Sequence, residues 1–446
     1  MLSPLRNRTY RHLFAAQVIA LGGTGLATVA LGLLAYELAG ANAGAVLGTA
    51  LAIKMIAYVG IAPVANAFVD RVPRRAFLVA MDAIRAAIAV MLPFVDQVWQ
   101  IYVLIFLLQS ASAGFTPTFQ AVIPDVLPDE KEYTKALSLS RLAYDLENLL
   151  SPTIAAALLA VMNFHWLFAG TAVGFAASAL LVVSTRVPQP QPLKEHRGIY
   201  ERTTRGSRIY LATPRLRGLL ALSLCVASAG AMVIVNTVVY VQSVLGRPEK
   251  DVAVALALFG GGSMVAALLL PRILDRLRDR PVMMTGGILL AAPMLAMGVA
   301  TFLFPDAVGW AELLAVWFVL GVGYSTVMTP SGRLLRRSSG QSDRPALFAA
   351  QFALSHACWL IAYPMAGWFG ARFGMPIAFL GLGMMTTVGL IAAPLLWPSR
   401  DPEIITHVHE DLPADHPHVH GATATANGLR HSHAYVIDDF HPHWPT

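Results

Sequence analysis

Histidine is concentrated at the C-terminal end of this chain, in a spacing typical of metal binding. Nine of the 13 histidines fall within the last 40 residues, all in His-x-His steps: His407, His409, His416, His418, His420, His431, His433, His441 and His443. Imidazole is a preferred ligand of Ni²⁺, Cu²⁺ and Zn²⁺, and His-rich tracts indicate metal binding by composition alone. Alternation along an extended chain puts the histidines of one step on one side, so neighbouring pairs can turn towards one ion. We therefore predict that this segment binds divalent transition-metal ions.

The segment that carries these histidines, residues 398–446, is predicted to be disordered when it holds no metal. It lacks long apolar runs, and it contains Pro402, Pro413, Pro417, Pro442 and Pro445. The fixed spacing of a Cys₂His₂ site is absent, which favours labile metal sites over one rigid zinc site. A tail with only incidental metal affinity is the alternative. The spacing does not identify the metal, because the Irving–Williams order favours Cu²⁺ over Ni²⁺.

A second group of reactive side chains lies inside long apolar runs: Lys54, Asp145, Glu147 and His356, with Asn148 next to Glu147. A charge at the centre of a bilayer costs at least about 2.5 kcal/mol, so these groups are expected to face protein or water. Carboxylates and imidazole suit a cation path and proton exchange, whereas an ammonium group repels divalent ions. The alternatives are that Asp145 only neutralises Lys54 or Arg141, and that His356 is a hydrogen-bonded core histidine.

The composition is that of a membrane protein. Of the 446 residues, 56% are hydrophobic and 13% are charged, against about 25% charged residues in soluble proteins. Cys225 and Cys358 form neither a disulfide framework nor a Cys-x-x-Cys metal site. A basic face for nucleic acid is not visible. Nucleophile, phosphate-loop and cofactor motifs are also missing, so we expect neither an enzyme nor a bound cofactor.

Apolar runs predict an all-α integral membrane protein with twelve transmembrane helices. The predicted spans are residues 11–38, 44–68, 76–95, 98–123, 136–161, 165–186, 214–245, 250–274, 281–304, 310–334, 345–372 and 375–397. A polar linker at 187–213 divides the chain into an N-terminal six-helix half, 1–186, and a C-terminal half, 214–397. No signal peptide is apparent, because the basic start leads directly into a long span.

The distribution of arginine predicts the orientation in the membrane. Basic residues occur at the N-terminus, in the linker, in the loops that follow the second and eighth spans, and near the loop between the tenth and eleventh spans. The loops on the opposite side are nearly free of them: Ala39–Ala43 and Asn163–His165 contain neither Lys nor Arg. In a twelve-span protein, all these basic segments lie on one side, which the positive-inside rule assigns to the cytoplasm. We therefore expect both termini, and the His-rich tail, to be cytoplasmic.

The two halves also share a motif. The Asp70-Arg71 turn, followed by Arg74 and Arg75, is repeated by the Asp275-Arg276 turn, followed by Arg278 and Arg280, at an offset of 205 residues. This arrangement resembles the major facilitator superfamily, and the resemblance covers roughly residues 8–397. It implies two pseudo-symmetric halves, and a cytoplasmic latch between transport states formed by Asp70, Arg71, Arg75, Asp275 and Arg280. Asn66 and Pro73 replace the glycines that are usual at this corner. The alternative is that these charged residues have no latch function and only determine the topology in the membrane.

Further motifs narrow the resemblance. Thr116–Pro128 and Leu149–Pro152 resemble the bacterial drug- and siderophore-exporter branch, and with its His-rich tail the chain is similar to nickel-resistance exporters of the NreB type. The resemblance implies that Lys54, Asp145, Glu147 and His356 line a central cavity. Asp82 and Arg85, on the peripheral third span, are spaced to pair on one helix face as a structural or gating brace.

These observations predict a monomeric bacterial inner-membrane transporter that exports Ni²⁺ or Co²⁺ in exchange for protons by alternating access. An exporter of an organic compound, such as a drug or siderophore, with a regulatory metal-binding tail is the alternative within transport. A non-transporting metal sensor is a third interpretation, but no output domain follows the spans.

Overall fold

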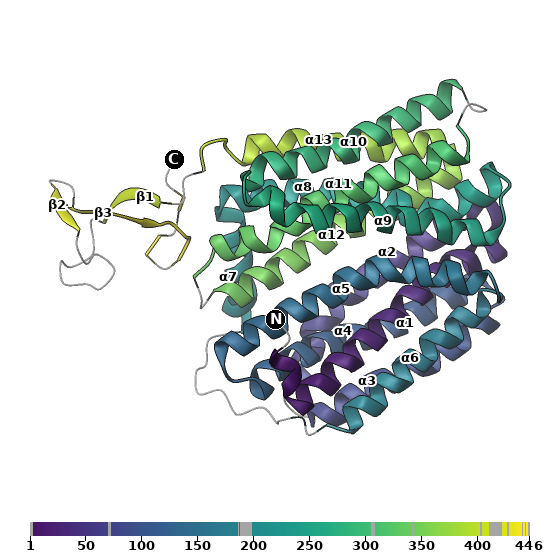
Figure 1. Ribbon diagram of the computed structural model, residues 1–446, viewed down its shortest axis with the longest axis horizontal. Coiled ribbons are helices and arrows are strands. Elements are labelled where there is room, and N and C mark those ends of the chain that lie inside the picture. Colours follow the sequence, from purple (N-terminus) through teal and green to yellow (C-terminus); the bar gives the residue numbers. More distant parts are fainter. Residues whose placement is uncertain are drawn as a thin grey trace.

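The computed structural model shows an all-α membrane protein with a small sheet at its C-terminal end (Figure 1). It describes residues 3–69, 73–185, 187, 199–304, 308–340, 343–401, 404–409, 422–425, 428–438, 440–441 and 443–444. Within these residues the N-terminal half contains α1 (Arg8–Ala39), α2 (Ala43–Val69), α3 (Arg74–Met91), α4 (Val98–Val126), α5 (Glu130–Leu159) and α6 (His165–Val183). The C-terminal half contains α8 (Pro214–Val239), α9 (Glu249–Leu274), α10 (Asp279–Leu303), α11 (Trp310–Arg337), α12 (Arg344–Phe373) and α13 (Met375–Leu396). The prediction of twelve long helices in two groups of six is confirmed.

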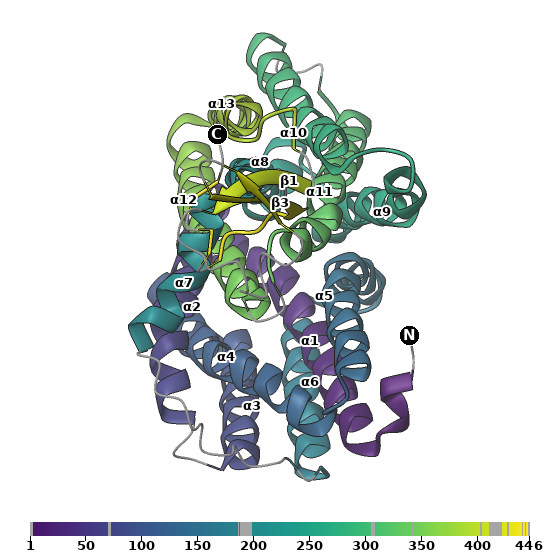
Figure 2. The same cartoon turned by 90° about the vertical axis from the view of Figure 1, so that its left-hand side faces the viewer.

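Short helical segments adjoin these long helices: η1 (Ser3–Arg6), η2 (Gly40–Asn42), η3 (Leu92–Phe94) and a π-helical turn, η4 (Tyr240–Val244). The predicted linker also contains a helix, α7 (Ile199–Ala212). It packs on the C-terminal half through Tyr210, whose hydroxyl donates to Gln351 Oε1 at 2.5 Å, and through Arg205, which pairs with Asp343 at 2.5 Å. Figure 2 shows α7 along one edge of the two helix groups.

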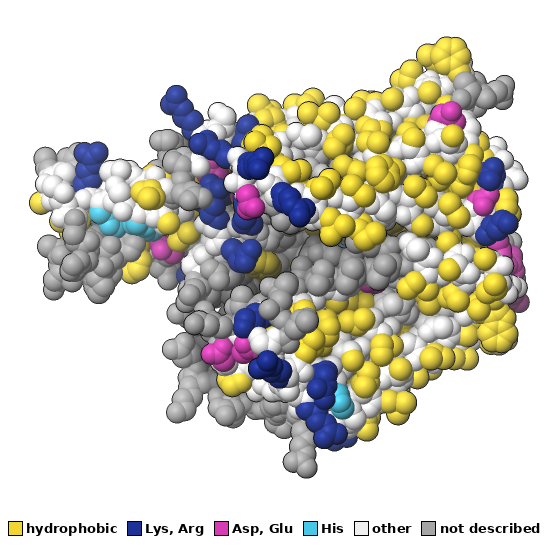
Figure 3. Space-filling model, in the orientation of Figure 1, with side chains coloured by type: hydrophobic (Ala, Val, Ile, Leu, Met, Phe, Trp, Pro, Cys, Tyr) yellow, Lys and Arg dark blue, Asp and Glu magenta, His cyan; other side chains and the backbone are white. Residues whose placement is uncertain are grey.

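Length and hydropathy identify membrane-crossing helices throughout both halves. Nine apolar stretches qualify within the described residues, and the first of them, Arg8–Ile61, covers most of α1 and α2. On the face shown in Figure 3, hydrophobic side chains spread over the described helices of both halves, while Lys and Arg gather mainly at the end that carries the sheet. Of the twelve long helices, α5 and α12 lie outside these stretches, and they carry Glu147 and His356 of the candidate site.

The two halves approach closely at the end away from the chain termini. A Cβ added at Gly48 of α2 would lie 2.5 Å from the Tyr363 carbonyl oxygen of α12, and one at Gly367 of α12 would lie 2.3 Å from the Gly44 carbonyl oxygen. Glycine is therefore required for these backbones to touch. At the same end, Ser243 Oγ donates to Tyr36 Oη at 3.0 Å.

Asn236 of α8 stabilises the same contact between the halves. It is fully buried, and its Nδ2 donates to the Ala366 carbonyl oxygen at 3.0 Å. Its Oδ1 would lie 2.7 Å from a Cβ at either Gly44 or Gly370, so the amide sits between three helices. A polar side chain that joins helices in this way is typical of membrane proteins.

The described part of the tail forms an antiparallel sheet, which the prediction of disorder did not anticipate. Its strands β1 (Ile404–His409), β2 (Thr423–Thr425) and β3 (Gly428–Ala434) lie in the order β1-β3-β2. Four of the six residues of β1 are isoleucine, valine or threonine, which favour strands, and the described strands contain no proline. The sheet and both chain ends lie at the same end of the bundle (Figures 1 and 2).

Candidate functional site

Pairing of β1 with β3 assembles five histidines into one cluster. The register puts His407 opposite His431 and Ile405 opposite His433, and His409 follows two residues after His407 on the same face. The loop after β3 brings His441 to the same place. The ligand nitrogens of His407, His409, His431, His433 and His441 all lie within 4.8 Å of one another. We call these five residues the imidazole cluster.

The rings of the cluster turn ring nitrogens towards one another. Nε2 of His407 lies 3.1 Å from Nε2 of His409, 3.1 Å from Nε2 of His431 and 2.9 Å from Nε2 of His441. In two of these rings the other nitrogen is turned outward: Nδ1 of His441 bonds Asp438 Oδ1 at 2.8 Å, and Nδ1 of His407 lies 3.2 Å from the Ile405 carbonyl oxygen. A carboxylate or carbonyl behind the ring is the usual support of a metal-binding histidine.

The spacing of the nitrogens suits one transition-metal ion. A metal–nitrogen bond of about 2.1 Å puts adjacent ligand atoms roughly 3.0–3.4 Å apart and opposite ones roughly 4.2 Å apart. Only small movements are therefore needed for several of the five imidazoles to bind the same ion. Burial lowers the pKa of His407, and nearby His441 and His433 act in the same direction, which favours the neutral form that binds metals.

The cluster groups histidines differently from the prediction, which paired neighbouring histidines of the sequence. The ligands come from two strands and a loop, up to 34 residues apart, and not from one His-x-His step alone. His443 is exposed and outside the cluster. Three predicted ligands, His416, His418 and His420, lie outside the described residues.

Three of the predicted transport residues interact electrostatically inside the helix bundle. Lys54 of α2 interacts electrostatically with Glu147 of α5 and with His356 of α12. All three side chains are half-buried. Glu147 points towards α1, because its Oε1 would lie 3.1 Å from a Cβ at Gly25. Glu147 is therefore one carboxylate that acts on the charge of Lys54; the side chains of Asp145 and Asn148 lie outside the described part of the chain.

Aromatic rings surround His356. Its ring centroid lies 3.9 Å from that of Phe352 and 5.9 Å from that of Tyr58, and its Nδ1 lies 2.7 Å from the Phe352 carbonyl oxygen. Tyr58 also interacts electrostatically with Glu147 and Tyr144. This group combines a cation, a carboxylate and an imidazole from both halves, as a proton-exchange site would require.

Asp82 and Arg85 form the ion pair that their spacing predicts, inside the N-terminal half. Ser178 Oγ of α6 donates to Asp82 Oδ2 at 2.7 Å. The Arg85 guanidinium lies over the rings of Phe115 of α4 and Phe175 of α6, at 4.1 and 4.5 Å from their centroids. The pair thus joins α3 to α4 and α6, which fits a structural brace.

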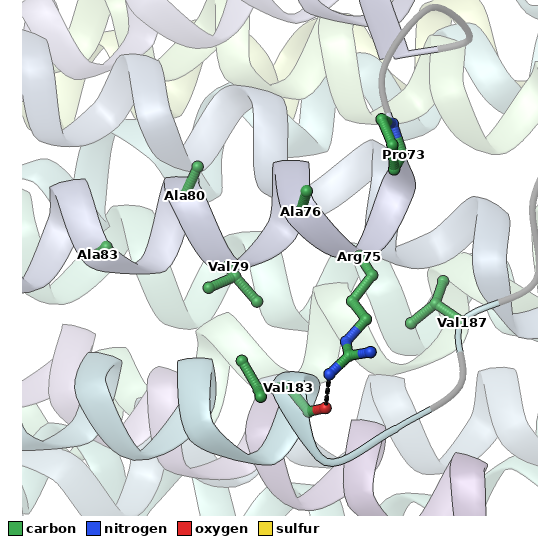
Figure 4. Close-up of a pocket in the computed structure, with 8 residues that line it drawn as sticks. All are labelled: Pro73, Arg75, Ala76, Val79, Ala80, Ala83, Val183 and Val187. Atoms are coloured by element: carbon green, nitrogen blue, oxygen red, sulfur yellow. Dashed lines mark hydrogen bonds between the residues drawn. The ribbon is translucent and has the colours of Figure 1, made fainter.

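The predicted latch is only partly described. Asp70 and Arg71 lie outside the described residues, and Asp275 is exposed. Arg75 donates to the Val183 carbonyl oxygen of α6 and borders a cavity of about 720 Å³ between α3 and α6, lined otherwise by alanine, valine and proline (Figure 4). Arg280 donates to the Trp397 carbonyl oxygen at 2.8 Å. These contacts of Arg75 and Arg280 stay within their own halves, and the latch remains a prediction.

Sequence reasoning missed an ion pair that is repeated in the two halves with its charges exchanged. Arg74, at the start of α3, pairs with Asp125 of α4 at 2.5 Å. Asp279, at the start of α10, pairs with Arg333 of α11 at 2.6 Å. Since 279 − 74 = 205, Arg74 and Asp279 are equivalent under the offset of the Asp-Arg turns. The same offset aligns Asp125 with Pro330, about one helical turn before Arg333, so it relates only one residue of each pair.

Comparison with known proteins covers both halves of the chain. The family model of the Major Facilitator Superfamily matches residues 13–311 and 220–423. The chain belongs to the Major Facilitator Superfamily. Like the other members of this superfamily, it is a multi-pass membrane transporter. Among solved structures, a mutant of the nucleoside transporter NupG superposes with a TM-score of 0.68 at 12% identity, covering 87% of this chain and 99% of NupG. A D-xylose–proton symporter superposes with a TM-score of 0.63 at 16% identity, covering 88% and 98%.

Relatives within the superfamily include two kinds of bacterial protein. The uncharacterized MFS-type transporter YfiS of Bacillus subtilis (strain 168) is 23% identical over 337 residues, which cover 74% of this chain and 79% of YfiS. Macrolide efflux protein A of Enterococcus faecalis is 26% identical over 153 residues, which cover 32% of this chain and 47% of that protein. These levels of identity do not assign a substrate to this member of the superfamily.

Proposed function

We propose that this transporter exports divalent transition-metal ions, first Ni²⁺ and then Co²⁺, from the cytoplasm in exchange for protons. The observation that carries the proposal is the imidazole cluster at the end of the bundle where both termini lie. The concentration of Lys and Arg at this end supports a cytoplasmic location in a bacterial inner membrane by the positive-inside rule. A metal-collecting segment in the cytoplasm suits export, because an exporter takes up its cargo there.

The central group of Lys54, Glu147 and His356 supports the proton-exchange step. Glu147 accepts a proton only by giving up its ionic interaction with Lys54, and a cation held by Glu147 and His356 would compete for the same carboxylate. Cargo and proton would then exclude each other, which is the requirement for antiport. Alternating access would expose the group to one side of the membrane at a time.

Export of an organic compound is the second candidate. The resemblance of 153 residues to macrolide efflux protein A favours it, as do the ammonium group of Lys54 and the rings of Tyr58 and Phe352 at the central group. In this case the imidazole cluster would regulate the transporter and would not deliver its cargo.

Transport into inside-out membrane vesicles separates the two candidates. We expect uptake of Ni²⁺, and more weakly of Co²⁺, that depends on a pH gradient and is at least tenfold lower in Glu147→Gln. A chain truncated after Pro398 should keep its maximal flux and require a higher metal concentration. Uptake of a macrolide without uptake of Ni²⁺, Co²⁺ or Zn²⁺ would replace metal export by the second candidate.

A further inference from the structure

The imidazole cluster lies against the transporter, and a buried arginine connects the two. Arg215, the second residue of α8, has a relative exposure of 1%. Its Nη2 donates to the Tyr435 carbonyl oxygen at 3.4 Å, and its guanidinium lies 4.9 Å from the ring centroid of Trp444. A cation over an indole ring is a specific attraction, strongest where water is excluded. Tyr435 and Trp444 therefore attach the tail to the first helix of the C-terminal half.

Tyr435 connects this attachment to the metal-binding residues. Its ring centroid lies 4.6 Å from that of His441, 5.0 Å from that of His407 and 5.3 Å from that of Trp444. Its hydroxyl donates to the His443 carbonyl oxygen at 2.8 Å. Tyr435 thus contacts His407 and His441 of the cluster and also holds the segment around His443, which places Trp444 on Arg215. Any movement of His441 relative to β1 and β3 must move this segment.

On the transporter side, Arg215 belongs to a charged network that joins four helices. Its Nη1 lies 3.6 Å from Asp401 Oδ1, and Asp401 Oδ2 accepts from Arg337 at 3.0 Å and from Trp397 Nε1 at 3.1 Å. Arg337 lies 3.8 Å from Asp279, at the start of α10. The ends of α8, α10, α11 and α13 therefore meet where the tail attaches.

The arrangement of the cluster indicates that an ion holds it together. Three imidazole nitrogens lie within 3.1 Å of His407 Nε2, yet one ring nitrogen has a single N–H or a single lone pair and can make only one good N–H···N bond. A shared cation satisfies all four nitrogens at once. The tail ligands reside on β1, on β3 and in the loop after it, so binding one ion closes the loop onto the sheet.

We propose that binding of a transition-metal ion to the imidazole cluster docks the tail on Arg215, as a metal-operated clasp at the end of the C-terminal half where the sheet lies. This inference rests on the proposed function only for metal binding by the tail, and it holds whether the cargo is a metal or an organic compound. Docking of the tail would then depend on the metal concentration on that side of the membrane, and it would change the contacts at the ends of α8 and α11.

Hydrogen exchange of the full-length protein, purified in detergent, tests the clasp with NiCl₂ as the probe. At a free Ni²⁺ concentration of 100 times the Kd, amides of β1 and of residues 435–438 should exchange about 100-fold more slowly than without metal. His441→Ala should lose this protection together with most of the metal affinity. His443→Ala is the matched control, because His443 is outside the cluster, and it should behave like the wild type.

Trp444→Ala separates docking from metal binding. It removes the ring over Arg215 and leaves the five ligands and the Arg215–Asp401 pair in place. We expect its Ni²⁺ affinity to stay within about threefold of the wild type, while Ni²⁺ no longer slows exchange at the start of α8. Arg215→Gln should give the same result. Protection at α8 that persists in Trp444→Ala and in Arg215→Gln, or that is equal with and without Ni²⁺ in the wild type, would overturn the clasp. Absence of metal flux in vesicles, with the Ni²⁺-dependent protection intact, would refute only the export proposal.

Discussion

At the scale of single residues, the imidazole cluster depends on the groups behind its rings. Asp438 holds Nδ1 of His441 and also accepts from the backbone nitrogens of Phe440 and His441. Burial alone would raise the pKa of Asp438, but the bonds from His441 and the backbone outweigh it and lower that pKa. Asp438 is therefore charged at neutral pH and can polarise the imidazole that it holds.

Replacing Asp438 should weaken metal binding without removing a ligand. We expect Asp438→Ala to lower the Ni²⁺ affinity of the purified protein roughly 10-fold to 100-fold, the usual effect of losing such a supporting carboxylate. Isothermal titration calorimetry measures it directly. His407→Ala should have a larger effect, since its Nε2 is next to three others, and His443→Ala should have none. Equal affinities of Asp438→Ala and His443→Ala would show that the ring orientation does not matter.

Lys54 and Glu147 should behave as a reciprocal pair. Removing either charge leaves the other without its partner inside the bundle, which costs less than the roughly 3–5 kcal/mol of a fully buried pair because both groups are half-buried. We expect Lys54→Met and Glu147→Gln each to lower the melting temperature in detergent, and the double variant to recover most of the loss. Proton-coupled transport should stay absent in the double variant. A double variant whose destabilisation is the sum of the two single effects would show that the pair is not coupled.

At the scale of elements, the closure of the bundle depends on glycines where α2 meets α12. Gly48→Ala puts a methyl group 2.5 Å from a backbone oxygen of the other half, so the helices must separate. We expect at least a tenfold loss of transport and increased labelling of a cysteine at Tyr36, which lies at the same end. Gly60→Ala is the matched control on α2, because a Cβ there meets nothing within 4 Å. Similar transport by the two variants would mean that this close approach is not needed in the cycle.

Elements differ in how far the sequence predicts them. The long helices follow from apolar runs that exceed the bilayer thickness, so twelve helices and the break at the linker were predictable. The tail was not, because short strands gain their stability from pairing and from packing of Tyr435 and Ile437 on the bundle, which no local pattern expresses. The imidazole cluster was not predictable either, because it depends on the pairing of β1 with β3. Apolar runs placed Lys54, Glu147 and His356 inside the membrane, but no local pattern shows that the charge of Lys54 on α2 acts on Glu147 of α5 and on His356 of α12.

At the scale of the whole molecule, the exchanged ion pairs show what the internal repeat preserves. Arg74–Asp125 and Asp279–Arg333 each tie the start of one helix to the end of another at the same corner of the two halves. The link from a helix start to a helix end is repeated, although the signs are reversed and Asp125 and Arg333 are not equivalent under the offset of 205 residues. The C-terminal pair is extended by Arg337 and Asp401 towards the tail, which makes this half the one that the clasp can influence.

The direction of transport depends on which compartment holds the imidazole cluster, and labelling of single cysteines decides this. The native Cys225 and Cys358 are buried, so they should give little background. In intact cells, a membrane-impermeant maleimide should label Ala41→Cys, at the exposed turn between α1 and α2, and should leave His443→Cys unlabelled. In inside-out vesicles the pattern should reverse, because the turn and the tail lie at opposite ends of the bundle. Labelling of His443→Cys in intact cells would put the cluster outside the cytoplasm. The tail would then gather metal on the external side, where it suits import or external sensing, and collection of cytoplasmic cargo by the cluster would be excluded.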